Sequence, residues 1–247
     1  MICILSPAKK MREDLDTLPP RDLPRFLNRT EQLLKALRAM SPAQLKTLWA
    51  CNDAIAGQNV ERLRRMDLRK RLTPALLAYD GIQYQYMAPG VFETPYFDYV
   101  QDHVRILSGF YGILRPFDGV TPYRLEMQAR LAVDGCRDLY QFWGRSLYDA
   151  LCEETDVIID LASAEYSRCV RKFLEPHVRC VRCCFAQRIN GKLVEKGVYV
   201  KMARGEMVRY MAETSARTVD DLRGFDRLGY RYSPEDSGEN ELVFLKP

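Results

Sequence analysis

A serine and a lysine stand three residues apart near the start of the chain, in the segment Ser6-Pro7-Ala8-Lys9. In penicillin-recognising acyl enzymes this S-x-x-K spacing places a nucleophilic serine one helical turn from a lysine. Those enzymes also carry S-D-N and K-T-G motifs, and the sequence contains neither. Ser6 is therefore better interpreted as a helix cap or turn former before Pro7, with Lys9 projecting beyond the apolar run.

Polar side chains also gather where apolar runs end, at Arg124 and Glu126 and again at Asp160, Ser163 and Glu165. Carboxylates beside Arg or Lys can be acid-base groups in a pocket, and they equally often tie buried segments together. An enzyme acting on an unidentified substrate stays open as an alternative. Its pocket would contain Ser6, Lys9, Arg124, Glu126, Ser163 and Glu165, with Lys9, Glu126 and Glu165 as the catalytic candidates.

The cysteine cluster Cys180, Cys183 and Cys184 has the composition of a zinc or redox site. If this segment is a strand, Cys180 and Cys183 point to opposite faces and cannot reach one ion. The chain has only two histidines and no second cysteine pair at finger spacing. We therefore predict no metal site and no cofactor, and interpret the eight cysteines as reduced, packed thiols; a redox role for this cluster stays open.

Two glycines three residues apart, Gly109 and Gly112, follow a helical pattern that we expect to run from Thr94 to Leu107. Such a turn can expose backbone N–H groups to a phosphate, and Arg105 and Arg115 flank it with positive charge. The plain alternative is a glycine C-cap and turn without a ligand.

Net charge does not identify a partner, because 37 Lys and Arg oppose 33 Asp and Glu. The distribution is more informative: residues 160–210 hold eleven basic and five acidic residues, whereas 212–242 hold four and eight. This asymmetry suits a basic cleft, although a solvated surface has the same pattern. The sequence has no membrane-length apolar stretch and no signal peptide pattern, so we expect a cytoplasmic protein without a membrane partner.

The predicted elements alternate between helices and strands along the chain. We expect strands at 1–5, 156–162, 177–188, 192–202, 229–232 and 241–245, and helices at 24–40, from Ser41-Pro42 to a break at Gly57, and at 94–107, 139–152, 165–173 and 203–214. Asn190-Gly191 predicts a hairpin turn. The fold class is α+β, a single mixed domain over residues 1–247 with central strands surrounded by helices.

Several segments together resemble one family, the YaaA-like peroxide stress response proteins. They occur in the family's order: SPAK at 6–9, LSGFYGILRPFD at 107–118, PYRLEM at 122–127, LYQFWG at 139–144, DLASAEY at 160–166, ARG at 203–205 and ELVF at 241–244. The chain departs from the family at Lys10-Met11, where Thr-Leu is more usual, and at Asp160, where Asn is more usual. The cysteine cluster is not a family signature.

The resemblance implies the family's own mixed fold, a cytoplasmic protein of the hydrogen peroxide response, protection of DNA and limitation of free intracellular iron. It also implies binding of double-stranded or branched DNA through a basic cleft and a helix-hairpin-helix element. We place this element around the turn from Gly109 to Gly112, although the family's glycines are usually two apart. The expected DNA-binding residues are Lys9, Lys10, Arg105, Ser108, Gly109, Gly112, Arg115, Arg124, Lys201 and Arg204.

Three functions therefore compete. We favour DNA binding through phosphate contacts, without strong sequence preference and without a stable protein partner. The enzyme with the small polar pocket is the second hypothesis. Direct iron sequestration is the third, and its ligand support is weak because the two histidines lie far apart in the sequence.

Overall fold

The apolar run at the start of the chain forms the centre of a mixed sheet in the computed structural model, which describes residues 1–246. β1 (Ile2–Leu5) is buried along its whole length. It pairs in parallel with β5 (Val104–Ser108) on one side and β8 (Val157–Asp160) on the other. Runs that are apolar at every position suit strands covered on both faces.

The described part of the sheet has eight strands, in the order β11-β12-β9-β8-β1-β5-β6, with β10 beside β9. β9 pairs in parallel with both β8 and β12, whereas β6, β10 and β11 are antiparallel to their neighbours. The remaining strands of this sheet are β6 (Gly112–Leu114), β9 (Arg179–Ile189), β10 (Lys192–Val194), β11 (Arg231–Tyr232) and β12 (Glu241–Lys246). Two further pairs of short strands are β2 (Lys10–Met11) with β4 (Tyr79–Asp80), and β3 (Thr73–Pro74) with β7 (Gly119–Val120).

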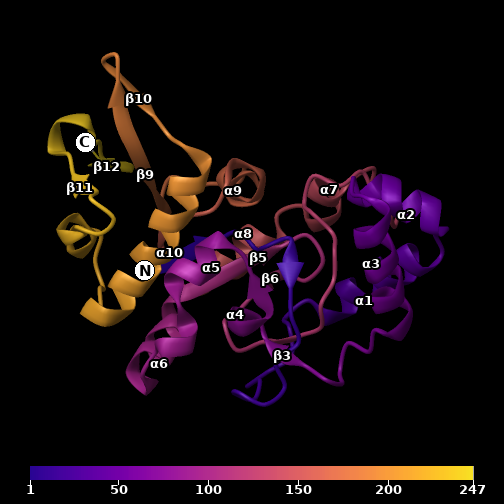
Figure 1. Cartoon of the computed structure of the whole chain (residues 1–247). Helices are drawn as coiled ribbons and strands as arrows, with labels where there is room; N and C mark the ends of the chain where they lie inside the picture. The colour runs from indigo at the N-terminus through magenta and orange to yellow at the C-terminus, as the bar shows by residue number, and fades with distance from the viewer. Residues whose placement is uncertain (247) are drawn as a thin grey trace.

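Helices surround this sheet. Figure 1 shows α1 to α3 gathered at one end of the molecule and the hairpin of β9 and β10 projecting at the other. The helices are α1 (Leu27–Arg38), α2 (Pro42–Trp49), α3 (Asp53–Arg65), α4 (Ala75–Ala78), α5 (Ile82–Met87), α6 (Thr94–His103), α7 (Leu139–Trp143), α8 (Ser146–Cys152), α9 (Ala164–Arg171) and α10 (Gly197–Thr214). Short 3-10 turns lie at Pro89–Val91, Asp220–Gly224 and Pro234–Asp236. The predicted mixed fold with central strands surrounded by helices is confirmed.

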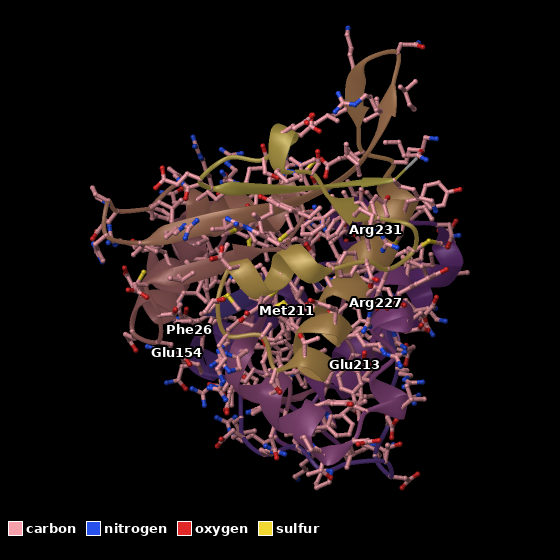
Figure 2. All side chains as sticks on the ribbon, turned by 90° about the vertical axis from the view of Figure 1, so that its left-hand side faces the viewer. Phe26, Glu154, Met211, Glu213, Arg227 and Arg231 are labelled. Carbon is pink, nitrogen blue, oxygen red and sulfur yellow. The ribbon has the colours of Figure 1, made fainter. Side chains whose placement is uncertain are left out.

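Helix α10 is held on two sides. It packs against α5, and its outer face is tied to the C-terminal segment by Arg227, which pairs with Glu206 at 3.3 Å and with Glu213. Figure 2 labels Arg227 and Glu213 at this junction. The position of α10 matters because its first half reaches the site described below.

Several local predictions are confirmed. Ser41 caps α2 with a complete capping box, in which its side chain accepts from Gln44 N and the Gln44 side chain accepts from Ser41 N. Asn190 and Gly191 both have positive φ angles, as the tight turn of a hairpin requires.

Other predictions of element bounds are wrong. The helix expected at 94–107 ends at His103, because the β-branched and apolar residues after it pair with β1 as β5. Gly57 does not break the chain and lies inside α3. The helix expected at 139–152 is divided at Gly144, which has a φ of 51°. The strand expected at 192–202 stops at Val194, and α10 begins at Gly197. Within residues 1–246, no helix is long and apolar enough to cross a membrane.

Candidate functional site

The ends of β1 and β8 define one edge of the sheet. The two strands are parallel neighbours, with Ile4 opposite Asp160, so both carboxyl ends lie at the same edge. Ser6 follows β1 directly, and Ser163 precedes α9 just after β8. In open α/β sheets, ligands bind in the crevice outside the carboxyl ends of the strands.

Two serines join these strand ends. Ser163 N donates to Ser6 Oγ at 2.8 Å, and Ser6 Oγ donates in turn to Ser163 Oγ at 3.1 Å. The Ser163 side chain makes no capping hydrogen bond to α9. Ser6 is thus a bridge between two strand ends, with Pro7 ending the first strand, and it is not paired with Lys9.

A cavity of about 530 Å³ lies above this edge, and we call it the polar cavity. It brings together all six residues that the sequence placed in a hypothetical pocket: Ser6, Lys9, Arg124, Glu126, Ser163 and Glu165. Three other predicted DNA contacts, Lys10, Lys201 and Arg204, line the same cavity. Segments that are far apart in the sequence therefore share one site.

One carboxylate in the polar cavity serves two cations. Lys9 Nζ lies 2.7 Å from Glu126 Oε2, and an Arg124 Nη lies 3.2 Å from Glu126 Oε1. The Lys9 side chain is 65% exposed, whereas that of Arg124 is 10% exposed. Lys9 is thus the exposed cation of this cluster, while Arg124 is a buried part of the wall.

Glu165 is the second carboxylate of the polar cavity. Burial raises its pKa, and the nearby charge of Glu126 raises it further, against hydrogen bonds from backbone N–H groups and the charge of Lys9. One of these hydrogen bonds is donated by Gln128 N to Glu165 Oε1 at 3.1 Å. The two carboxylates therefore differ: Glu126 is ion-paired, and Glu165 holds a proton more readily than an ordinary glutamate.

A larger cavity of about 1090 Å³ adjoins the first, and we call it the outer cavity. Ser163, Lys201 and Arg204 line both, so the two cavities form one continuous cleft. The outer cavity is also lined by Arg168, Arg171 and Arg182, which no motif in the sequence indicated. Their only signal in the sequence was the basic balance of residues 160–210.

The cations of the cleft differ in whether they are neutralised. Arg182 pairs with Glu195 and with Glu241 at 3.0 Å, and Arg171 lies 3.5 Å from Asp160. Within residues 1–246, by contrast, Lys201 and Arg204 have neither a carboxylate partner nor a hydrogen bond, as the described contacts show. Burial lowers the pKa of Arg204, against the attraction of the Glu195 and Asp160 charges, neither of which forms an ion pair with it.

Gly205 allows the close packing of α10 that positions Lys201 and Arg204. An added Cβ on Gly205 would lie 2.1 Å from the Gln83 carbonyl oxygen, so α10 approaches α5 more closely than any side chain allows. Lys201 and Arg204 lie one turn apart on the same helix and so share a face, which lines the cleft. Gln83 itself lines the polar cavity, and nothing in the sequence indicated it.

The predicted pair Arg105 and Arg115 does not reach this cleft. Both pair with Glu154, Arg115 at 2.9 Å, and the three residues line a separate cavity of about 230 Å³. Arg105 is buried and also donates to the backbone oxygens of Gln101 and Val104. Its charge is thus already neutralised inside the protein.

The turn at Gly109 and Gly112 is not a helix-hairpin-helix element. It joins the antiparallel strands β5 and β6, and Ser108, Gly109 and Gly112 are all buried. The N–H groups of Phe110 and Tyr111 donate to Ser108 Oγ at 3.1 and 2.9 Å. The donors that we expected to meet a phosphate are therefore already paired, because residues 104–108 form a fully buried strand and not the end of a helix.

The cysteine cluster is part of the core. Cys180, Cys183 and Cys184 are buried free thiols in β9, and burial raises the pKa of Cys180 to about 12 and that of Cys184 to about 11. No group of His, Cys, Asp and Glu in residues 1–246 has the arrangement of a metal site.

Comparison with known proteins gives the family. The family model for peroxide stress protein YaaA matches residues 1–236. A UPF0246 protein of Desulfitobacterium hafniense is 52% identical over 246 residues, covering 100% of this chain and 98% of the relative. UPF0246 proteins of Lachnoclostridium phytofermentans and Agathobacter rectalis are 52% and 51% identical, over 100% and 99% of this chain and 96% and 98% of their own lengths. The chain therefore belongs to the peroxide stress protein YaaA family, also described as UPF0246.

Proposed function

We propose that this peroxide stress protein binds double-stranded or branched DNA in the cytoplasm, and that the cleft at the carboxyl edge of the sheet is the binding surface. The observation that carries the proposal is the pair Lys201 and Arg204, two cations without a carboxylate partner among the described residues, at the point where both cavities meet. Cations that are not neutralised internally are available for phosphate groups.

The proposed interface differs in part from the one expected from the sequence. It keeps Lys9, Lys10, Arg124, Lys201 and Arg204, which line the polar cavity, and adds Arg168 from the outer cavity, whereas Arg171 and Arg182 in the same cavity are paired with carboxylates. It leaves out Arg105, Ser108, Gly109, Gly112 and Arg115, which are buried or paired elsewhere. In this proposal the protein protects DNA because it occupies the duplex. The effect on free intracellular iron is then indirect.

The test is duplex and junction binding measured by fluorescence anisotropy between 50 and 200 mM salt. Affinity should fall steeply with salt, because each phosphate contact releases counterions. Lys201→Glu should weaken binding about tenfold and lower the salt dependence, since Lys201 is exposed and unpaired. Arg115→Glu is the matched control, a surface charge reversal outside the cleft.

Two results would refute DNA binding through this cleft. One is an affinity that does not change with salt. The other is an equal effect of Lys201→Glu and Arg115→Glu, which would show that only the overall charge matters.

A second candidate function is an enzyme that uses the polar cavity. The observation that favours it is the difference between two carboxylates: Glu126 is ion-paired, whereas the pKa of Glu165 is raised. Two carboxylates that differ in this way can act as the base and the acid of one reaction. The ion pair between Lys9 and Glu126 counts against Lys9 as a free nucleophile. Native and intact mass spectrometry of the purified chain tests this candidate: a bound metabolite or adduct lost in Glu165→Gln supports it, and an unmodified, empty chain contradicts it.

A further inference from the structure

Buried donors without acceptors cluster around the cleft. Four such nitrogens in residues 1–246 are Trp49 Nε1, Gln83 Nε2, Arg124 Nε and Arg204 Nε. Gln83, Arg124 and Arg204 line the polar cavity, and Trp49 lines an adjoining groove that shares Glu126 with it. Buried polar groups in folded proteins nearly always have partners, so donors concentrated at one cavity indicate a missing acceptor.

The chemistry of these donors narrows the ligand. Indole and guanidinium groups donate hydrogen bonds and accept none, so their partner must be rich in oxygen lone pairs. Gln83 is 7% exposed and the Arg124 side chain 10%, so both are parts of the wall. The four nitrogens have almost no solvent-exposed surface, so bulk water at the mouth of the cavity does not pair with them.

The net charge of the residues that line the polar cavity narrows the choice of ligand further. Five cations line the polar cavity, namely Lys9, Lys10, Arg124, Lys201 and Arg204, and three carboxylates oppose them, namely Asp80, Glu126 and Glu165. Two positive charges are left over when all three carboxylates are ionised. A phosphate monoester carries close to two negative charges at neutral pH and matches this excess, whereas a diester carries one.

The start of α9 supplies further donors on the same side of the cavity. The helix has eight residues, and its first N–H groups, at Ala164 and Glu165, lack intrahelical acceptors. Ser163, Glu165 and Arg204 line the same cavity, so the helix N-terminus and the unpaired guanidinium share one space. The N-terminus of a helix favours negative charge, and the buried Gln83 Nε2, which has no acceptor and belongs to a side chain lining the same cavity, is the independent sign of a missing oxygen-rich group.

We infer that the polar cavity binds a phosphate monoester, held by Arg204, Lys201 and the first turn of α9. The group has two sources with the same chemistry, a free nucleoside monophosphate and the terminal phosphate of a nucleic-acid strand. The inference extends the proposed function and does not depend on it, because a monoester site can exist without a duplex on the outer cavity.

The test is isothermal titration of the full chain with adenosine monophosphate, and with adenosine as the matched probe that lacks the phosphate. Saturable one-site binding of the monophosphate, at least tenfold tighter than adenosine, is the expected result. Arg204→Met keeps an apolar side chain of similar length and should weaken binding at least tenfold, whereas Arg115→Met should leave it unchanged. Circular dichroism checks that each variant is folded. If Arg204→Met is not folded, Lys201→Met replaces it, and the affinity for the monophosphate should then fall at least threefold.

Further measurements identify the source and separate the two proposals. Displacement of the monophosphate by a 5′-phosphorylated duplex, and not by a 5′-hydroxyl duplex, assigns the site to strand ends. No displacement by either duplex assigns it to free nucleotides. Equal binding of adenosine and its monophosphate, or an equal loss in Arg204→Met and Arg115→Met, overturns the inference. If the monophosphate inference is overturned but duplex binding still weakens with salt, the DNA proposal stands. If the monophosphate binds and no duplex binds, the monophosphate site stands and the DNA proposal fails.

Discussion

Ser163 N donates a hydrogen bond to Ser6 Oγ at 2.8 Å and so ties the end of β1 to the start of α9. The two residues are far apart in the sequence but follow neighbouring parallel strands. Ser6 thus fixes the edge of the cleft and the orientation of the helix that borders it.

Replacement of Ser6 by alanine removes this acceptor and the contact with Ser163 Oγ. We expect Ser6→Ala to lower the free energy of unfolding by about 1–2 kcal/mol, measured by urea denaturation. Ser41→Ala is the control, because it removes the cap of α2 at a cost of about 1 kcal/mol but lies outside the cleft. Only Ser6→Ala should also weaken ligand or duplex binding; unchanged stability would show that the bridge contributes nothing.

Glu154 neutralises a buried guanidinium, and its removal should be costly. Arg105 is 3% exposed, so Glu154→Gln leaves its charge without a carboxylate and should destabilise the protein by about 3 kcal/mol. Glu154 is labelled in Figure 2. The partner Arg115 is half exposed, so Arg115→Met should change stability by less than about 1 kcal/mol. Equal urea midpoints for Glu154→Gln and Arg115→Met would contradict the expected difference in stability between the two variants.

Asp118 should make stability depend on pH. Burial raises its pKa from 3.8 to about 7, against the pull of Arg115 and Arg105. The folded state therefore binds the proton more tightly than the unfolded chain. This contribution is fully present below pH 3.8 and is lost as the pH rises through about 7, with an upper limit of about 4 kcal/mol at 1.4 kcal/mol per pKa unit.

Asp118→Asn is the variant that checks this pH dependence, because an amide oxygen can still accept the hydrogen bond from Arg115 N. Urea denaturation at pH 5 and pH 8 should show a smaller loss of stability in Asp118→Asn than in the parent. An identical pH profile would show that Asp118 titrates normally.

Two glycines in helices should respond in opposite ways to alanine. Gly205→Ala places a Cβ against the Gln83 backbone and should lower stability by more than about 2 kcal/mol, since α10 must move away from α5. Gly57→Ala meets no atom within 4 Å and should raise stability by up to about 1 kcal/mol through helix propensity. Thermal denaturation of both variants checks this, and a neutral Gly205→Ala would mean that the helices can separate freely.

The sequence by itself determined the local features of this protein. The apolar run of β1, the Ser41-Pro42 helix start and the Asn190-Gly191 turn could be read directly, because each depends on neighbouring residues only. Six polar residues that line the polar cavity, Ser6, Lys9, Arg124, Glu126, Ser163 and Glu165, were also found from the sequence, whereas Gln83 was not. They stand where apolar runs end, and parallel strands bring such ends to one edge.

Only the tertiary structure decided which cations are available. Arg105 and Arg204 look alike in the sequence, yet Arg105 is neutralised by Glu154, 49 residues away, while Arg204 has no carboxylate partner in the described chain. The same holds for the turn at Gly109, whose neighbouring N–H groups are paired once β5 and β6 form a buried hairpin. Whether a charge or a donor is free depends on partners that folding brings from elsewhere in the chain, and spacing along the sequence does not contain that information.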